Sequence, residues 1–123
     1  MAFRILRNRL NHSCVIHTDV SNTITIAGNS STSNIAIGAE VITGAAITQA
    51  WFGGEATSVW VVKRGSNTAC VLNPSGEAYV DFRGNGNSLD LDANATLVMT
   101  LTGGANSYLM LELKKIGPST IYT

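Results

Sequence analysis

The stretch Leu97-Val-Met-Thr-Leu-Thr-Gly-Gly-Ala-Asn-Ser-Tyr-Leu-Met-Leu-Glu-Leu113 decides the fold class of this chain. On either side of the Gly-Gly-Ala-Asn break, apolar side chains recur at every second position. This period places alternate side chains on opposite faces of a β-strand. We therefore predict two adjacent strands whose inward faces carry Leu97, Met99, Leu101, Leu109, Leu111 and Leu113.

The same period of two runs through most of the chain, and no window has the apolar stripe of a helix longer than about two turns. Turn-forming Gly, Asn and Pro residues in the second half recur about 8–11 residues apart, a spacing typical of β-sandwiches and barrels. We predict an all-β fold, an antiparallel β-sandwich or a jelly-roll-like barrel. The predicted strands are 3–10, 13–18, 21–27, 34–37, 45–52, 57–64, 69–72, 77–82, 87–91, 95–102 and 108–116, and 27–32 is a predicted loop.

The 123 residues are predicted to form one domain, with an extended N-terminal arm (1–11), a β-sandwich core (12–117) and a short C-terminal tail (118–123). Only 13% of the residues are charged, the formal net charge is zero, and Ser, Thr and Asn supply 35 residues. Such a neutral surface repels its own copies weakly, which favours close-packed assembly. Lys and Pro on edge strands normally prevent pairing with strands of other chains. Because this chain has only three Lys and two Pro, we expect other subunits to cover some edges.

The start of the chain and its composition argue against several classes of protein. Arg4, Arg7 and Arg9 interrupt the first ten residues, so we expect no secretion signal. No run approaches the about 20 apolar residues of a membrane span, and the basic residues form no stripe that would bind nucleic acid. For Cys14 and Cys70 we expect buried, reduced thiols. A disulfide between them is an alternative only if their strands are neighbours.

No constellation of residues indicates catalysis, a cofactor or a metal. His12, Cys14 and His17 have metal-ligating side chains, but His17 would point away from the other two and no fourth ligand accompanies them. Asp90 and Asp92 begin like a calcium loop, yet the sixth and twelfth positions lack the required glycine and glutamate. No Gly-x-Ser-x-Gly nucleophile elbow is present. We therefore predict a protein that is not an enzyme.

The two ends of the chain carry the predicted contacts with partners. The arm offers apolar anchors among guanidinium groups that bind carboxylates bidentately, although a solvated edge strand is an alternative for the same residues. The tail is rich in β-forming residues and can add a strand to a neighbour's open edge. We predict a homo-oligomer, with a trimer favoured. The candidate contact residues are Phe3, Arg4, Arg7, Arg9, Ile121 and Tyr122.

Trp51 and Trp60 support a different hypothesis. Either ring can be the sugar-stacking residue of a carbohydrate-binding β-sandwich module, for example one that recognises glycans on a host surface. Tryptophan also fills sandwich cores and oligomer interfaces. The sequence alone leaves these alternatives open.

Several segments from position 57 onward resemble small structural proteins of tailed-phage virions, of the kind found in phages of aquatic bacteria. They are Ser58-Val-Trp-Val-Val-Lys-Arg-Gly-Ser-Asn67, Cys70-Val-Leu-Asn-Pro-Ser-Gly-Glu77, Leu89-Asp-Leu-Asp-Ala-Asn94 and Leu109-Met-Leu-Glu-Leu-Lys-Lys-Ile116. The resemblance implies a β-sandwich or jelly-roll protein without catalytic residues, present in many copies as a head decoration (cement) protein or as a neck or tail component. It also implies assembly in the host cytoplasm and binding to other virion proteins, such as the major capsid protein.

Overall fold

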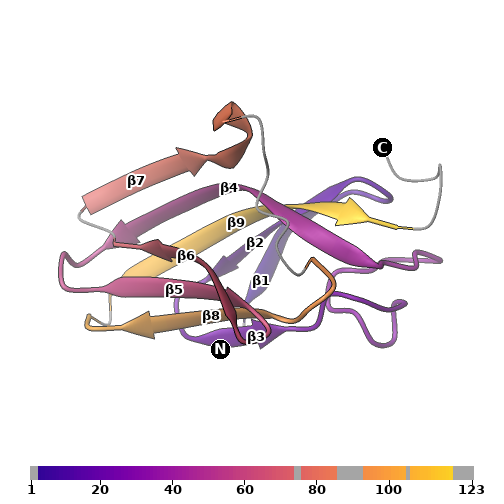
Figure 1. Cartoon of the computed structure of the whole chain (residues 1–123), viewed down its shortest axis with the longest axis horizontal. Helices are drawn as coiled ribbons and strands as arrows, with labels where there is room; N and C mark the ends of the chain where they lie inside the picture. The colour runs from indigo at the N-terminus through magenta and orange to yellow at the C-terminus, as the bar shows by residue number, and fades with distance from the viewer. Residues whose placement is uncertain (1–2, 74–75, 86–92, 105, 118–123) are drawn as a thin grey trace.

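The chain folds into strands joined by turns and loops (Figure 1), so the prediction of an all-β fold is confirmed. The computed structural model describes residues 3–73, 76–85, 93–104 and 106–117. Within these residues the elements are β1 (Arg4–Asn8), β2 (Ser13–Thr18), β3 (Asn22–Ile24), β4 (Gly44–Gly54), β5 (Val59–Arg64), β6 (Asn67–Leu72), β7 (Gly76–Asp81), the 3-10 helix η1 (Phe82–Asn85), β8 (Leu97–Thr102) and β9 (Ser107–Ile116).

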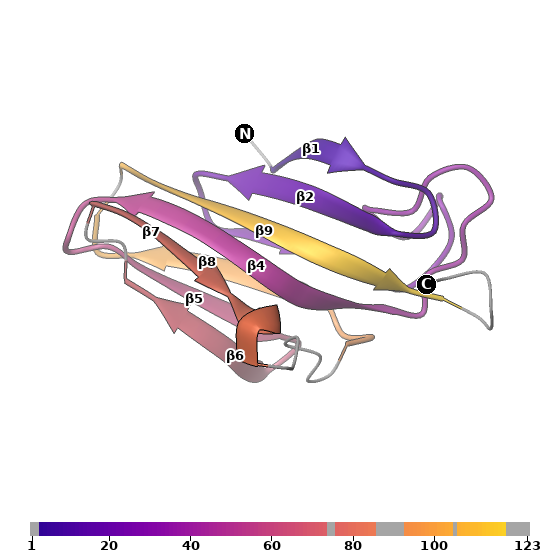
Figure 2. The same ribbon diagram turned by 90° about the horizontal axis from the view of Figure 1, so that it is seen from above.

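The strands form two sheets that pack face to face (Figure 2). One sheet has the order β1-β2-β9-β4-β7, the other has the order β3-β8-β5-β6, and neighbouring strands are antiparallel. β2 pairs with β9, β3 with β8, β4 with β7, and β5 with β6. These four pairs are nested in the sequence around the β5–β6 hairpin. This is the strand order of a jelly roll, built here as an open sandwich and not as a closed barrel.

The core lies between the sheets and is lined by the inward positions of the alternating pattern. Of the predicted inward residues, Leu97, Met99, Leu109, Leu111 and Leu113 are buried and Leu101 is half-buried. The predicted adjacency of their two strands is wrong, because β8 and β9 lie in opposite sheets. A period of two fixes which side chains face the core, but it does not fix the hydrogen-bonded neighbour.

A glycine helps the chain to cross between the sheets after β8. Gly103 has a φ of 95°, a conformation that favours glycine, and a Cβ there would lie 1.9 Å from the carbonyl oxygen of Thr57. The crossing is therefore a close approach of two backbones. The segment after β8 therefore leads from one sheet to the other and does not join two neighbouring strands.

An irregular segment joins β3 to β4 and includes residues 34–37, which the alternating pattern predicts as a strand. That prediction is wrong, because backbone groups here bond inside the segment: the Ile37 N–H donates to the Glu40 carboxylate at 2.8 Å. The apolar side chains still reach the core, and Ile35 is fully buried. The predicted strand 87–91 lies outside the described residues.

A buried ion pair fastens this segment to the sandwich. The Lys115 side chain on β9 and the Glu40 side chain are fully buried, with 2.8 Å between Nζ and Oε1. Lys115 Nζ also donates to Asn8 Oδ1 at 2.5 Å, and the N–H groups of Asn11 and Ile37 donate to the Glu40 carboxylate. Burial acts to raise the pKa of Glu40, but these hydrogen bonds outweigh it and hold the pKa below its ordinary value of 4.5. The pair therefore joins β1, the irregular segment and β9 in its ionised form.

Candidate binding face of the five-stranded sheet

Residues 4–8 of the predicted arm form β1, the edge strand of the five-stranded sheet. β1 pairs with β2, and a bulge lies between Ile5 and Arg7. Leu6, within the bulge, is 51% exposed. Arg7 Nη2 lies 3.6 Å from Glu112 Oε2 of β9. The sequence leaves two alternatives for these residues, a contact with a partner or a solvated edge strand, and the structure has them in an edge strand. Glu112 of the same chain supplies the carboxylate that pairs with Arg7.

The other predicted contact residues have different surroundings. Phe3 is half-buried and packs against the core. Arg4 and Arg9 are exposed. Ile121 and Tyr122 lie outside the described residues. The exposed side chains near the start of the chain are therefore the arginines and the aliphatic residues of β1, while the aromatic ring of Phe3 is held by this chain's own core.

The two tryptophans lie on opposite sides of their sheets. Trp60 on β5 points into the core and is fully buried. The hypothesis that it stacks on a sugar is wrong, because no ligand reaches its ring. Trp51 on β4 is half-buried, and it faces outward because its neighbours Ala50 and Phe52 are both buried. Trp51 is therefore the tryptophan that remains a candidate for stacking.

Trp51 belongs to a set of aromatic side chains on the outer face of the five-stranded sheet. It lies opposite Tyr79 of β7 in the strand register, and the two ring centroids are 5.5 Å apart at an interplanar angle of 35°. Tyr108 of β9 stacks on His17 of β2, with centroids 6.1 Å apart and an angle of 10°. Trp51, Tyr79, Tyr108 and Ala78 line a hollow of about 320 Å³. We call Tyr79, Trp51, Tyr108 and His17 the aromatic row.

A hydrogen-bonded polar cluster borders the aromatic row. The Tyr79 hydroxyl donates to Gln49 Oε1 at 2.5 Å, and Gln49 Nε2 donates to Glu112 Oε1 at 2.5 Å. Thr48 Oγ1 donates to the same Glu112 oxygen at 2.7 Å. Burial acts to raise the pKa of Glu112, but the hydrogen bonds from Gln49 and Thr48 and nearby arginine charges outweigh it and hold the pKa below 4.5. Glu112 is therefore an ionised acceptor that fixes the side chains around it.

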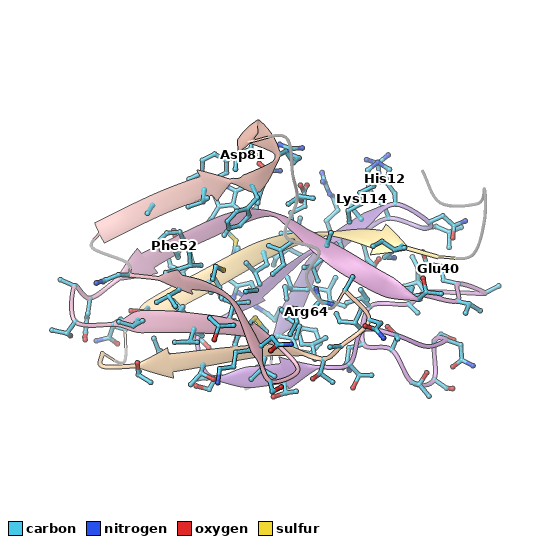
Figure 3. The ribbon with its side chains drawn as sticks, viewed as in Figure 1. His12, Glu40, Phe52, Arg64, Asp81 and Lys114 are labelled. Carbon is cyan, nitrogen blue, oxygen red and sulfur yellow. The ribbon has the colours of Figure 1, made fainter. Side chains whose placement is uncertain are left out.

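The outer face becomes charged beyond this cluster, where β9 continues to Lys114. A second hollow, of about 220 Å³, is lined by His12, Ser13, Thr48, Arg83, Glu112 and Lys114. Figure 3 shows His12 and Lys114 close together at this end of the sheet. Arg83 Nε lies 3.1 Å from Asp81 Oδ1. The face thus has the aromatic row at one end and these charged side chains, the charged end, at the other, with the polar cluster between them.

The side chains considered for metal binding and nucleophilic chemistry do not meet. Cys14 points into the core, whereas His17 lies on the outer face. Cys14 and Cys70 are free thiols, and burial raises the pKa of Cys14 to about 12 and that of Cys70 to about 11. Both thiols are therefore protonated at neutral pH and unreactive. Asp90 and Asp92 lie outside the described residues, and within those residues no three His, Cys, Asp or Glu side chains gather as metal ligands do.

The strand order, the surface of β1 and the outer face of the five-stranded sheet are the features of this chain that bear on its function. A scan against protein-family models and searches of curated proteins and of solved structures found no significant match. The described part of the chain also contains no helix able to span a bilayer.

Proposed function

We propose that this chain is a non-enzymatic structural protein of a phage virion, which self-assembles and binds the capsid or tail as a decoration (cement) protein. The jelly-roll strand order supports the proposal, because viral capsid domains commonly have this architecture. A fold alone does not identify a function. The observation that carries the proposal is the exposed apolar surface of β1 and of the turn that follows it.

Three large aliphatic side chains are exposed within residues 5–10. Ile5 is 37% exposed, Leu6 51% and Leu10 58%, and residues 4–10 also hold three exposed arginines but no lysine. Protein interfaces are enriched in arginine and depleted in lysine, and their centres are apolar. β1 is also the edge of its sheet, where a further strand can pair through main-chain hydrogen bonds. This segment therefore has the composition and the position of a subunit contact.

In the proposed assembly, this surface contacts a second copy of the chain, and the favoured state is a homotrimer seated on other virion proteins such as the major capsid protein. The tail residues Ile121 and Tyr122 add contacts to a neighbour's open edge. The zero net charge of the chain supports dense packing of copies, because their mutual repulsion is weak.

Light scattering on the full-length protein at micromolar concentration, together with mass spectrometry of purified virions, tests this proposal. We expect an oligomer in solution and many copies in each particle. Replacing Ile5 and Leu6 with serine should yield monomers and abolish particle binding while the circular-dichroism spectrum stays that of the folded wild type, because both side chains are exposed. Val71→Ser, at a 59% exposed site on β6 in the other sheet, is the matched control. A wild-type monomer that does not bind particles contradicts the proposal.

A further inference from the structure

We propose that the aromatic row on the outer face binds a neutral oligosaccharide, with Trp51 as the main stacking ring and with Tyr79 and Tyr108 beside it. This function goes beyond assembly, since it uses a different surface from β1. The three rings line one hollow of about 320 Å³, a volume at the small end of ligand sites. A single pyranose unit of a longer chain is an occupant of suitable size and chemistry.

The lining of the hollow matches the chemistry of a sugar ring. A pyranose has an apolar face of C–H groups and a rim of hydroxyls, so it packs on an aromatic face while its hydroxyls stay hydrated. Trp51 and Tyr79 offer such rings side by side, with their centroids 5.5 Å apart, and Tyr79 is 49% exposed. Aromatic rings with a polar group suit a ligand that is apolar on one side and wet on the other.

The rings are held in place before any ligand arrives. The hydrogen bond from Tyr79 to Gln49, and the one from Gln49 to Glu112, fix the Tyr79 ring from the polar cluster. The stack of Tyr108 on His17 fixes the other side of the hollow. Binding to rings that are already ordered loses less side-chain entropy than binding to mobile ones.

The charges on this face favour a neutral glycan over a second copy of the chain. None of the four residues that line the hollow is a Lys, Arg, His, Asp or Glu. The carboxylate of Glu112, in the bordering polar cluster, is occupied by hydrogen bonds and by Arg7. A contact between copies would need about 800 Å² from each partner, and on this sheet that area would include the charged end with Arg83 and Lys114. Charged residues are depleted at the centres of protein interfaces.

Titration of the full-length protein with cellohexaose, maltohexaose and mannohexaose tests the proposal. Saturation-transfer NMR reports binding, and tryptophan fluorescence reports contact with Trp51, because the ring of Trp60 is buried. We expect at least one hexasaccharide to bind and to change the emission of Trp51. Trp51→Ala should weaken that binding at least tenfold. Tyr79→Phe keeps the ring but loses the hydrogen bond to Gln49, so its effect should be several-fold smaller than that of Trp51→Ala.

Val71→Ala on the opposite sheet is the control and should bind as the wild type does. The proposal is overturned if none of the three sugars binds at about 10 mM, well above millimolar dissociation constants, or if Trp51→Ala binds as tightly as the wild type. It is also overturned if Trp51→Ala lowers the oligomeric mass while no sugar binds, since the face is then a contact between copies. Glycan binding by a monomer that is absent from virions would refute the assembly proposal and leave this one standing.

Discussion

Glu112 and Lys115 lie three residues apart on β9, yet their ion pairs have opposite environments. The pair of Glu112 with Arg7 is on the outer face, where the two side chains are 15% and 56% exposed. The pair of Lys115 with Glu40 is inside, and both side chains are fully buried. Water can replace a lost partner on the outer face, but no water can do so inside. The side of the sheet, more than the chemistry of the charges, therefore determines what each pair contributes to stability.

The largest expected effect comes from the inner pair. Lys115→Met should lower the free energy of unfolding by about 3–5 kcal/mol, because it leaves the Glu40 carboxylate buried without its cation. Chemical denaturation at neutral pH measures this. The double variant Lys115→Met with Glu40→Gln should recover part of the loss, since no buried charge remains. A single variant that loses less than about 1 kcal/mol would show that water reaches Glu40.

The two faces of β9 also differ in packing. Leu111 is fully buried in the central strand of its sheet, so Leu111→Ala should cost about 2–5 kcal/mol. Met110, its outward neighbour, is half-buried, and Met110→Ala should cost clearly less. Denaturant melts of the two variants provide the measurement. Equal losses would mean that the assignment of faces is wrong.

A smaller effect is expected from acid. The carboxyls of Glu40 and Glu112 both have a pKa below 4.5 in the folded protein. A group with a lowered folded pKa stabilises the protein above its unfolded pKa, and this contribution is lost as the pH falls through the folded pKa. Wild-type stability should therefore fall below about pH 4.5, and the Glu40→Gln, Lys115→Met double variant should fall less steeply. Parallel pH profiles would contradict this expectation.

The smallest effect is expected at the outer pair. Arg7→Ala should change the free energy of unfolding by no more than about 1 kcal/mol, because the Arg7 side chain is largely solvated. The difference from wild type should shrink further in about 1 M salt, where the screening length is only about 3 Å. Arg4→Ala, on the same strand, is the matched control. A loss as large as that of Lys115→Met would remove the distinction between the two faces.

The faces of strands could be predicted from the sequence, but their neighbours could not. Alternation in residues 97–101 and 109–113 identifies the inward side chains, since a pleated strand projects every second residue to one side. It contains no information on pairing, so it predicts β8 and β9 as adjacent strands although they lie in different sheets. Residues 34–37 show a related limit, because an irregular segment can also bury aliphatic side chains at every second position.

The candidate site could be predicted in part. Trp51 alternates with the buried Ala50 and Phe52, and Tyr79 alternates with the partly buried Ala78 and Val80. Their outward placement can therefore be predicted once the strands are known. Trp60 lies in a run that is apolar on both faces, so the alternating pattern does not predict which face its side chain is on. Lys115 has the same phase as Leu111 and Leu113, a signal that it points inward. Its partner Glu40 lies 75 positions away in an irregular segment, and no local pattern reveals that contact.

The order of the strands along the chain has a consequence for the synthesis of this protein. β9 follows all the other described strands in the sequence, yet it lies in the middle of its sheet and pairs with both β2 and β4. Until it emerges from the ribosome, those two strands have no strand between them, and the buried Glu40 has no cation. Long-range strand pairing of this kind is slow and leaves edges exposed in the meantime. The sandwich therefore closes only after β9 has been translated.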